Sequence, residues 1–225
     1  MKKTLLTCLL LAPTVSFSKD SSNLSEDKKT EQTELKKQAN EKNLKTTSSS
    51  KTTVAGKLEI GQKIPDLPEN SNLLAFVNNG DVWSQKNLEN KLALIFYVAP
   101  GEKDLNRHVT DTIKKANLNK QHYSSYAIVN MKASPWPNFI LSWKLSASQK
   151  EFKNTNYVKD YKRVLVEKWG LKDNSNDVVL LKNGKVLFLH KGKLPKERAE
   201  KLVELLKQEI AIIAQSKEKN KKVVA

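Results

Sequence analysis

Cysteine is almost absent from this chain of 225 residues, since Cys8 is the only one. It lies in an apolar run at the N-terminus, so a chain processed after that run contains no thiol. Disulfide formation, dithiol–disulfide exchange and cysteine peroxidase chemistry all require a thiolate. The composition therefore excludes these activities for the domain that follows residue 18.

The N-terminus has no apolar run long enough to span a bilayer, which takes about 20 residues. Met1-Lys2-Lys3 is followed by a short apolar stretch up to Ala12 and then by Pro13 to Ser18. A basic start, a short apolar core and a small-residue exit are typical of a secretory signal peptide, here residues 1–18. We expect the protein to be periplasmic or secreted, with tethering to the inner membrane if the signal is not cleaved. Lipidation at Cys8 is a weaker alternative.

Large apolar side chains are scarce in residues 19–56, which are rich in Ser, Thr, Lys and Glu. Such a segment cannot bury a core, so we expect a disordered linker there and a basic disordered tail at 216–225. The chain carries a net charge of +16, of which +9 falls in residues 56–215. We expect weak attraction to anionic surfaces. We expect no nucleic-acid partner, because the chain lacks a basic helix with interleaved aromatics.

Residues 57–215 contain the patterned part of the chain. The continuous apolar run at 92–98 predicts a central strand buried on both faces. Asn183-Gly184 between two apolar runs predicts a tight hairpin turn. The expected strands are 73–77, 92–98, 126–129, 178–182 and 185–190, and the expected helices are 104–117, 157–169 and 195–213. Residues 139–148 are ambiguous, with a short helix as one interpretation.

The order of these elements favours one fold class. A strand, a helix and a second strand form a right-handed parallel crossover, and a hairpin and a terminal helix complete the chain. This is the thioredoxin-like arrangement, an α/β three-layer sandwich with a mixed central sheet and helices on both faces.

Two stretches carry a family resemblance. Tyr126 to Asn130 is followed by a long insert containing proline and tryptophan, and Trp169-Gly170 leads into Val178 to Val186. In these stretches the chain resembles the YtfJ family, exported bacterial thioredoxin-like proteins of unknown activity. The resemblance covers roughly residues 57–213 and implies the fold, but no chemistry.

The chain departs from the redox members of the fold at both parts of their usual site. Thioredoxin-like enzymes place Cys-x-x-Cys between the first central strand and its helix, where the helix N-terminus stabilises a thiolate. Here that loop, Ala99 to Leu105, contains two carboxylates and no sulfur. Thioredoxins also have a cis-proline before the hairpin, where this chain has Asn176-Asp177.

The candidate binding residues are in this loop and in the insert: Pro100, Gly101, Glu102, Asp104 and Trp136. A rigid Pro-Trp-Pro loop can present an aromatic side chain to a ligand. The alternatives are that Glu102 and Asp104 only stabilise the first turn of a helix and that Trp136 only covers the core.

The three histidines, His108, His122 and His190, match no metal-binding spacing. We therefore expect no catalytic residue, metal or cofactor. The leading hypothesis is a non-catalytic envelope module that binds a protein or peptide. The alternative is a periplasmic enzyme with non-thiol chemistry, using Glu102, Asp104 or His108 as acid, base or ligand.

Overall fold

The structure, a computed structural model, describes residues 56–67 and 73–224, with side chains up to residue 219. The expected signal peptide, residues 1–18, lies outside the described residues, as does the linker 19–56 apart from Gly56. Within the described ranges, no helix combines the length and apolar character that crossing a membrane requires.

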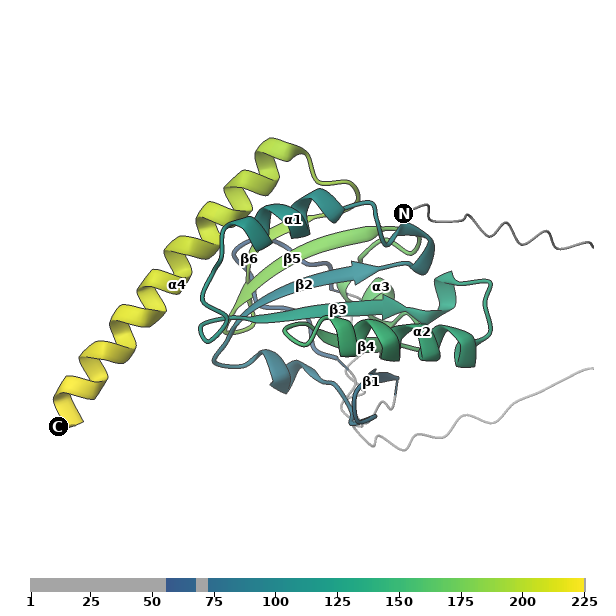
Figure 1. Cartoon of the computed structure of the whole chain (residues 1–225), viewed down its shortest axis with the longest axis horizontal. Coiled ribbons are helices and arrows are strands. Elements are labelled where there is room, and N and C mark those ends of the chain that lie inside the picture. Colours follow the sequence, from purple (N-terminus) through teal and green to yellow (C-terminus); the bar gives the residue numbers. More distant parts are fainter. Residues whose placement is uncertain (1–55, 68–72, 225) are drawn as a thin grey trace, which may run out of the picture. The chain divides into compact units, whose positions relative to one another are not determined.

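A six-stranded mixed sheet forms the centre of the domain, in the order β1-β4-β3-β2-β5-β6 (Figure 1). Strands β2, β3 and β4 are parallel, whereas β1, β5 and β6 each run antiparallel to a neighbour. The bounds are β1 Leu74–Phe76, β2 Leu92–Val98, β3 Ser124–Asn130, β4 Asn156–Asp160, β5 Asn176–Lys182 and β6 Lys185–His190. The sheet confirms the thioredoxin-like class.

Helices cover both faces of the sheet. On one face Leu94 and Phe96 of β2 contact α1 (Arg107–Lys115) and α4 (Lys196–Val224). On the same face, α2 (Asn138–Glu151) packs against the end of β3. Side chains that alternate with these along β2 join a second core under α3 (Val164–Trp169). The period-two alternation of a strand thus divides the apolar run at 92–98 between two cores.

The hairpin and the crossover agree with the sequence predictions. Asn183 and Gly184 have φ values of 52° and 72°, the left-handed backbone that a tight hairpin turn requires. β2 and β3 pair in parallel on either side of α1, as the crossover predicted. The ambiguous segment after Pro137 is a full helix of 14 residues.

The predicted helix at 157–169 is wrong in its first half. Residues Asn156–Asp160 form β4, which pairs with β1 on one side and with β3 on the other. Val158 is buried in either conformation, so its helical spacing to Leu165 and Trp169 misled the sequence interpretation. Hydrogen bonds to two neighbouring strands override a weak local helical pattern.

Two helix boundaries also differ from those expected. α1 begins at Arg107, after a short 3-10 turn at Pro100–Glu102, so Asp104 precedes the helix instead of lying in its first turn. α4 continues to Val224, so the segment expected as a disordered tail from residue 216 is helical through residue 224. Its buried apolar residues end at Ile210, and the rest of the helix extends beyond the sheet (Figure 1).

Candidate functional site

A groove of about 770 Å³ lies between α1 and α2 on the sheet face that they share. One wall consists of the loop after β2 and the exposed side of α1. The other consists of the Pro135-Trp136 loop and α2 from Leu141 to Glu151. The groove therefore lies along the edge of the loop that carries the cysteines in redox proteins of this fold.

Small side chains of β3 create the floor. Ser125, Ala127 and Val129 alternate toward this face, with Phe96 of β2 and Tyr157 of β4 beside them. α1 has only nine residues, and α2 packs over the far end of β3 through Leu141 and Leu145. Neither helix covers the middle of β3, where Ser125 and Ala127 are half-buried.

Tyr157 provides a neutral hydroxyl in this floor. Burial, and then the charge of nearby Glu151, raise the pKa of Tyr157 above its ordinary value. The hydroxyl therefore remains protonated at neutral pH and is available as a hydrogen-bond donor. Gln149 fixes the position of Tyr157, since its side-chain oxygen accepts the Tyr157 N–H at 2.9 Å.

Asn106 fixes the loop end of the groove. Its side chain is 1% exposed and donates to the carbonyls of Asn176, at 2.6 Å, and Gly192, at 3.0 Å. Its amide oxygen accepts the Leu194 N–H at 2.8 Å. One asparagine thus joins the loop after β2 to the start of β5 and to the segment before α4.

Asn176, one of the two residues at the position where thioredoxins have a proline, lines the groove. Its side-chain nitrogen donates to the Glu102 carbonyl at 3.3 Å. Its buried Oδ1 finds no hydrogen-bond donor among the described residues. A buried acceptor without a partner is costly, so this end of the groove favours a ligand that brings an N–H or O–H.

Aromatic rings and lysines form the two rims. Lys144 Nζ lies 5.1 Å from the centre of the Trp136 ring within the α2 wall. Lys114 Nζ, from α1, lies 5.3 Å from the Phe152 ring that follows α2. The second contact crosses from one wall to the other and closes the groove at the end away from Asn176. Such contacts hold the rings in place at about 0.5–1 kcal/mol each.

The structure brings four of the five predicted site residues to this groove: Pro100, Gly101, Asp104 and Trp136 line it. Glu102 does not line it, and only its backbone carbonyl contributes, through Asn176. Asp104 is exposed and lies 3.8 Å from the Arg107 guanidinium, also exposed. This surface pair leaves the Asp104 carboxylate in contact with solvent.

Sequence reasoning missed Asn106, Asn176, Lys144 and Phe152. No local motif marks them, because they come from four different segments of the chain. Asn176 could have been found as the residue that replaces the proline of the thioredoxin pattern.

Two of the three histidines, His108 and His190, contact backbone carbonyls of the segment before α4. His108 Nε2 lies 2.7 Å from the Leu194 carbonyl, and His190 Nε2 lies 2.9 Å from the Lys193 carbonyl. Across residues 56–67 and 73–224, no three His, Cys, Asp or Glu side chains gather as metal ligands would.

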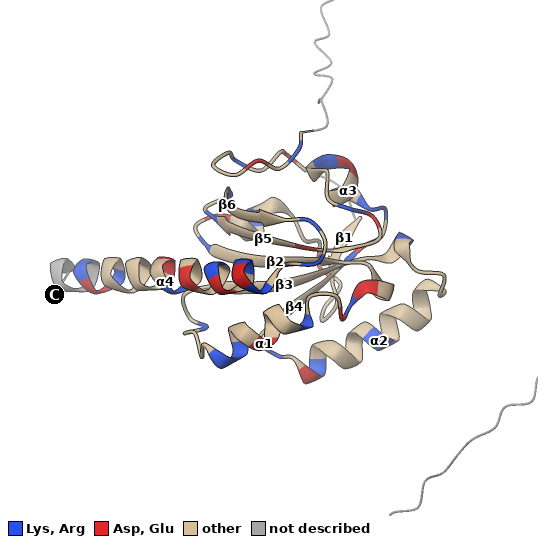
Figure 2. Ribbon diagram, turned by 90° about the horizontal axis from the view of Figure 1, so that it is seen from above, with Lys and Arg blue, Asp and Glu red and all other residues tan. Residues whose placement is uncertain are grey.

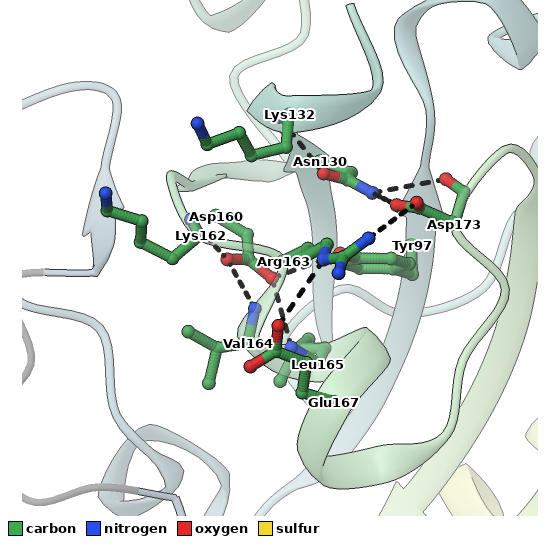
Figure 3. Close-up of polar contacts among 10 residues, drawn as sticks. All are labelled: Tyr97, Asn130, Lys132, Asp160, Lys162, Arg163, Val164, Leu165, Glu167 and Asp173. Carbon is green, nitrogen blue, oxygen red and sulfur yellow. Dashed lines mark hydrogen bonds and ion pairs between the residues drawn. The ribbon is translucent and has the colours of Figure 1, made fainter. Parts of the chain in front are cut away.

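A second polar cluster lies on the opposite face of the sheet, at the start of α3 (Figure 3). The buried Asp160 carboxylate accepts the N–H groups of Val164, at 2.8 Å, and Leu165, at 3.1 Å. It also accepts the Tyr97 hydroxyl at 3.1 Å. Burial raises the pKa of Asp160 above its ordinary value, although these hydrogen bonds oppose the shift.

Tyr97 responds to the same burial. Desolvation, and then the Asp160 charge, raise the pKa of Tyr97 far above its ordinary value. Nearby, Asn130 donates to Asp173 Oδ1 at 2.7 Å, and Arg163 pairs with Asp173 Oδ2 at 3.1 Å (Figure 3). Both oxygens of Asp160 accept hydrogen bonds, so the cluster ties α3 to the sheet.

Comparisons with known proteins point to one family. Residues 74–209 match the model of a family described as "Bacterial protein of unknown function (YtfJ_HI0045)". The uncharacterized protein YtfJ of Escherichia coli K12 is 26% identical over 130 residues, which cover 56% of this chain and 71% of that protein. An uncharacterized protein of Haemophilus influenzae is 23% identical over 165 residues, which cover 70% of this chain and 90% of that protein.

Solved structures similar to this chain include two thiol proteins. The exposed lipoprotein thioredoxin of Streptococcus pneumoniae has a TM-score of 0.45 and 18% identity, covering 60% of this chain and 96% of that one. The thiol peroxidase of Chromobacterium violaceum has a TM-score of 0.46 and 13% identity, and the match covers 68% of this chain and 91% of that one.

Proposed function

The chain belongs to the YtfJ_HI0045 family of bacterial proteins of unknown function, and we propose that it acts as an exported, non-catalytic binding module. Its ligand is an extended protein or peptide segment that enters the groove between α1 and α2. The N-terminal pattern at residues 1–18 supports export to the cell envelope.

One observation carries this proposal: the groove borders the loop of the thioredoxin-like fold that would hold reactive cysteines, yet it is lined by no cysteine. Its volume of about 770 Å³ falls within the range of ligand pockets, about 300–1,000 Å³. What remains at this position is a shaped surface with a fixed loop, aromatic rims and an open floor.

The residues that line the groove indicate the chemistry of the ligand. Phe96, Ala127 and Val129 form an apolar floor, which favours apolar side chains of the ligand. Asn176 Oδ1 at one end has no donor among the described residues and can accept a hydrogen bond, and the Tyr157 hydroxyl can donate one. An extended backbone offers N–H and C=O groups together with apolar side chains, so it matches this lining better than a compact polar metabolite does.

The test is capture of a partner from the envelope fraction of the bacterium that encodes the protein, using the full chain as bait. Ala127→Phe fills the middle of the groove, where residue 127 is half-buried, and Trp136→Ala removes one rim. Trp143→Ala is the matched control, because Trp143 is also exposed but does not line the groove.

We expect the native chain and Trp143→Ala to capture the same protein, and Ala127→Phe to lose it. Capture of the same protein by Ala127→Phe would contradict the proposal that the groove is the binding site. Turnover of a substrate that Asp104→Asn abolishes would contradict the non-catalytic role.

A further inference from the structure

Helix α2 exposes large aromatic side chains on the side away from the sheet. Phe139 is 74% exposed and Trp143 is 72% exposed, while Trp136 in the preceding loop is 55% exposed. The same helix buries Leu141 and Leu145 against the sheet. It is therefore apolar on two opposite sides, and only one of them contacts the core.

Helical geometry places the exposed aromatics together. At about 100° per residue, Trp143 lies about 40° from Phe139 around the helix axis. Lys150 lies about 20° from Phe139, two turns beyond Trp143. Leu141 and Leu145 lie on the opposite side, about 200° and 240° from Phe139. We call Phe139, Trp143 and Lys150 the outer face of α2.

The charge near this face is mainly basic. Residues 131–150 contain three lysines, Lys132, Lys144 and Lys150, and no Asp or Glu. All three lysines are exposed. Lys144 and Glu151, the last residue of α2, both line the groove, so Lys150 is the charged residue on the outer face itself. Figure 2 shows α2 with few charged residues along its length, whereas α4 carries both signs.

We propose that the outer face of α2 docks on an anionic lipid surface. Helices with tryptophan and phenylalanine on one side and lysine around them lie in the interface of a bilayer. The aromatic rings enter the boundary between headgroups and acyl chains, and the lysine stems reach back to the headgroup phosphates. The protein then rests on the membrane along α2, independently of the N-terminal segment.

Charge complementarity favours an anionic lipid surface over a second copy of this chain as the occupant of this face. A second copy of this chain would bring its own lysines against these, since the face carries no acidic residue to meet them. An anionic bilayer supplies the opposite charge along the whole helix, together with an apolar layer for rings that are otherwise in water.

The experiment measures binding of the full chain to vesicles of phosphatidylcholine and phosphatidylglycerol in equal parts, against vesicles of phosphatidylcholine alone. Three chains are compared: native, Phe139→Ala/Trp143→Ala, and Ala127→Phe. A fourth variant, Trp136→Phe, leaves Trp143 as the exposed tryptophan, because Trp83 and Trp169 are buried. Its emission then reports the environment of α2, whatever the N-terminal residues do.

We expect a blue shift of Trp143 emission with the anionic vesicles only. Phe139→Ala/Trp143→Ala should weaken binding at least about tenfold, and each Lys→Gln change at 132, 144 or 150 about fivefold. Ala127→Phe should bind lipid as the native chain does, which separates this site from the groove.

An unshifted Trp143 emission would overturn the proposal. So would equal binding by the native chain and the double aromatic variant. Self-association that the double variant abolishes, without any lipid-dependent shift, would assign the face to a second copy instead. Loss of partner capture by Ala127→Phe bears only on the groove, so the two proposals fail separately.

Discussion

Replacing Asn106 by alanine tests how the groove is held open. The Asn106 side chain makes three hydrogen bonds, to the carbonyls of Asn176 and Gly192 and from the Leu194 N–H, of which the one to Gly192 is partly buried and the others are buried. Each is worth about 0.5–1.5 kcal/mol net. Alanine also leaves these three backbone groups without partners, so we expect a loss of about 3 kcal/mol in the free energy of unfolding.

Urea denaturation of the full chain measures this loss. With an m-value of about 2 kcal/mol/M, the midpoint should fall by about 1.5 M. Amide hydrogen exchange at Leu194 should accelerate, because this N–H donates to Asn106 Oδ1. Asn154→Ala is the matched control, since Asn154 is exposed, and its effect should stay within about 0.5 kcal/mol.

Asn106→Asp sharpens the test without changing the size of the side chain. A carboxylate cannot donate, so it would oppose two carbonyl oxygens at neutral pH and cost more than alanine does. Protonation at low pH restores one donor, so the deficit should shrink as the pH falls. If Asn106→Ala moved the midpoint by less than about 0.5 M, the three contacts would not fix the loop and the reasoning would be refuted.

Three further predictions concern the cores and the hairpin. Because the pKa of Asp160 is raised in the folded chain, its protonated form stabilises the fold below about pH 4, and this stability is lost as the pH rises through the folded pKa. The free energy of unfolding of the native chain, relative to that of Asp160→Asn, should therefore fall over that pH window. A rise over the same window would show that the hydrogen bonds to Asp160 outweigh its burial. Trp169→Phe should lower the free energy of unfolding, measured in urea, by about 1 kcal/mol more than Trp83→Phe does. The reason is that Trp169 Nε1 donates to the Pro65 carbonyl at 3.1 Å, whereas buried Trp83 Nε1 finds no acceptor among the described residues. Equal losses would contradict this prediction. Gly184→Val should lower the thermal midpoint, because φ of 72° strains a β-branched residue, while Gly101→Ala, at ordinary φ and with open space around the added carbon, should leave it unchanged.

Several elements could be predicted because their patterns are local. The apolar run at 92–98 and the Asn183-Gly184 turn each determine their structure within a few residues. Their order along the chain then favours the thioredoxin-like topology. β4 could not be predicted, because its conformation depends on pairing with β1 and β3 rather than on the helical spacing of Val158 and Leu165.

The candidate site was predictable only in part. Pro100 and Gly101 follow the central strand, so the fold class alone places them at the usual site of this fold. Trp136 stood out as an unusual local feature. Asn106 was not predictable, because its hydrogen bond to a carbonyl 70 positions away has no signal in either segment.

The outer face of α2 shows a related limit. Its two apolar sides give the helix no periodic contrast, so the sequence alone left residues 139–148 ambiguous. Only the packing of Leu141 and Leu145 against the sheet reveals that Phe139 and Trp143 are the exposed pair.

Site-specific photo-crosslinking in living cells tests the proposed groove most directly. A photoreactive residue at Ser148, on the α2 wall of the groove, is compared with one at Lys168 on α3, on the other face of the sheet. The account predicts a crosslinked partner at 148 that Ala127→Phe abolishes, and none at 168. A partner crosslinked at 168, or one at 148 that persists in Ala127→Phe, would contradict it.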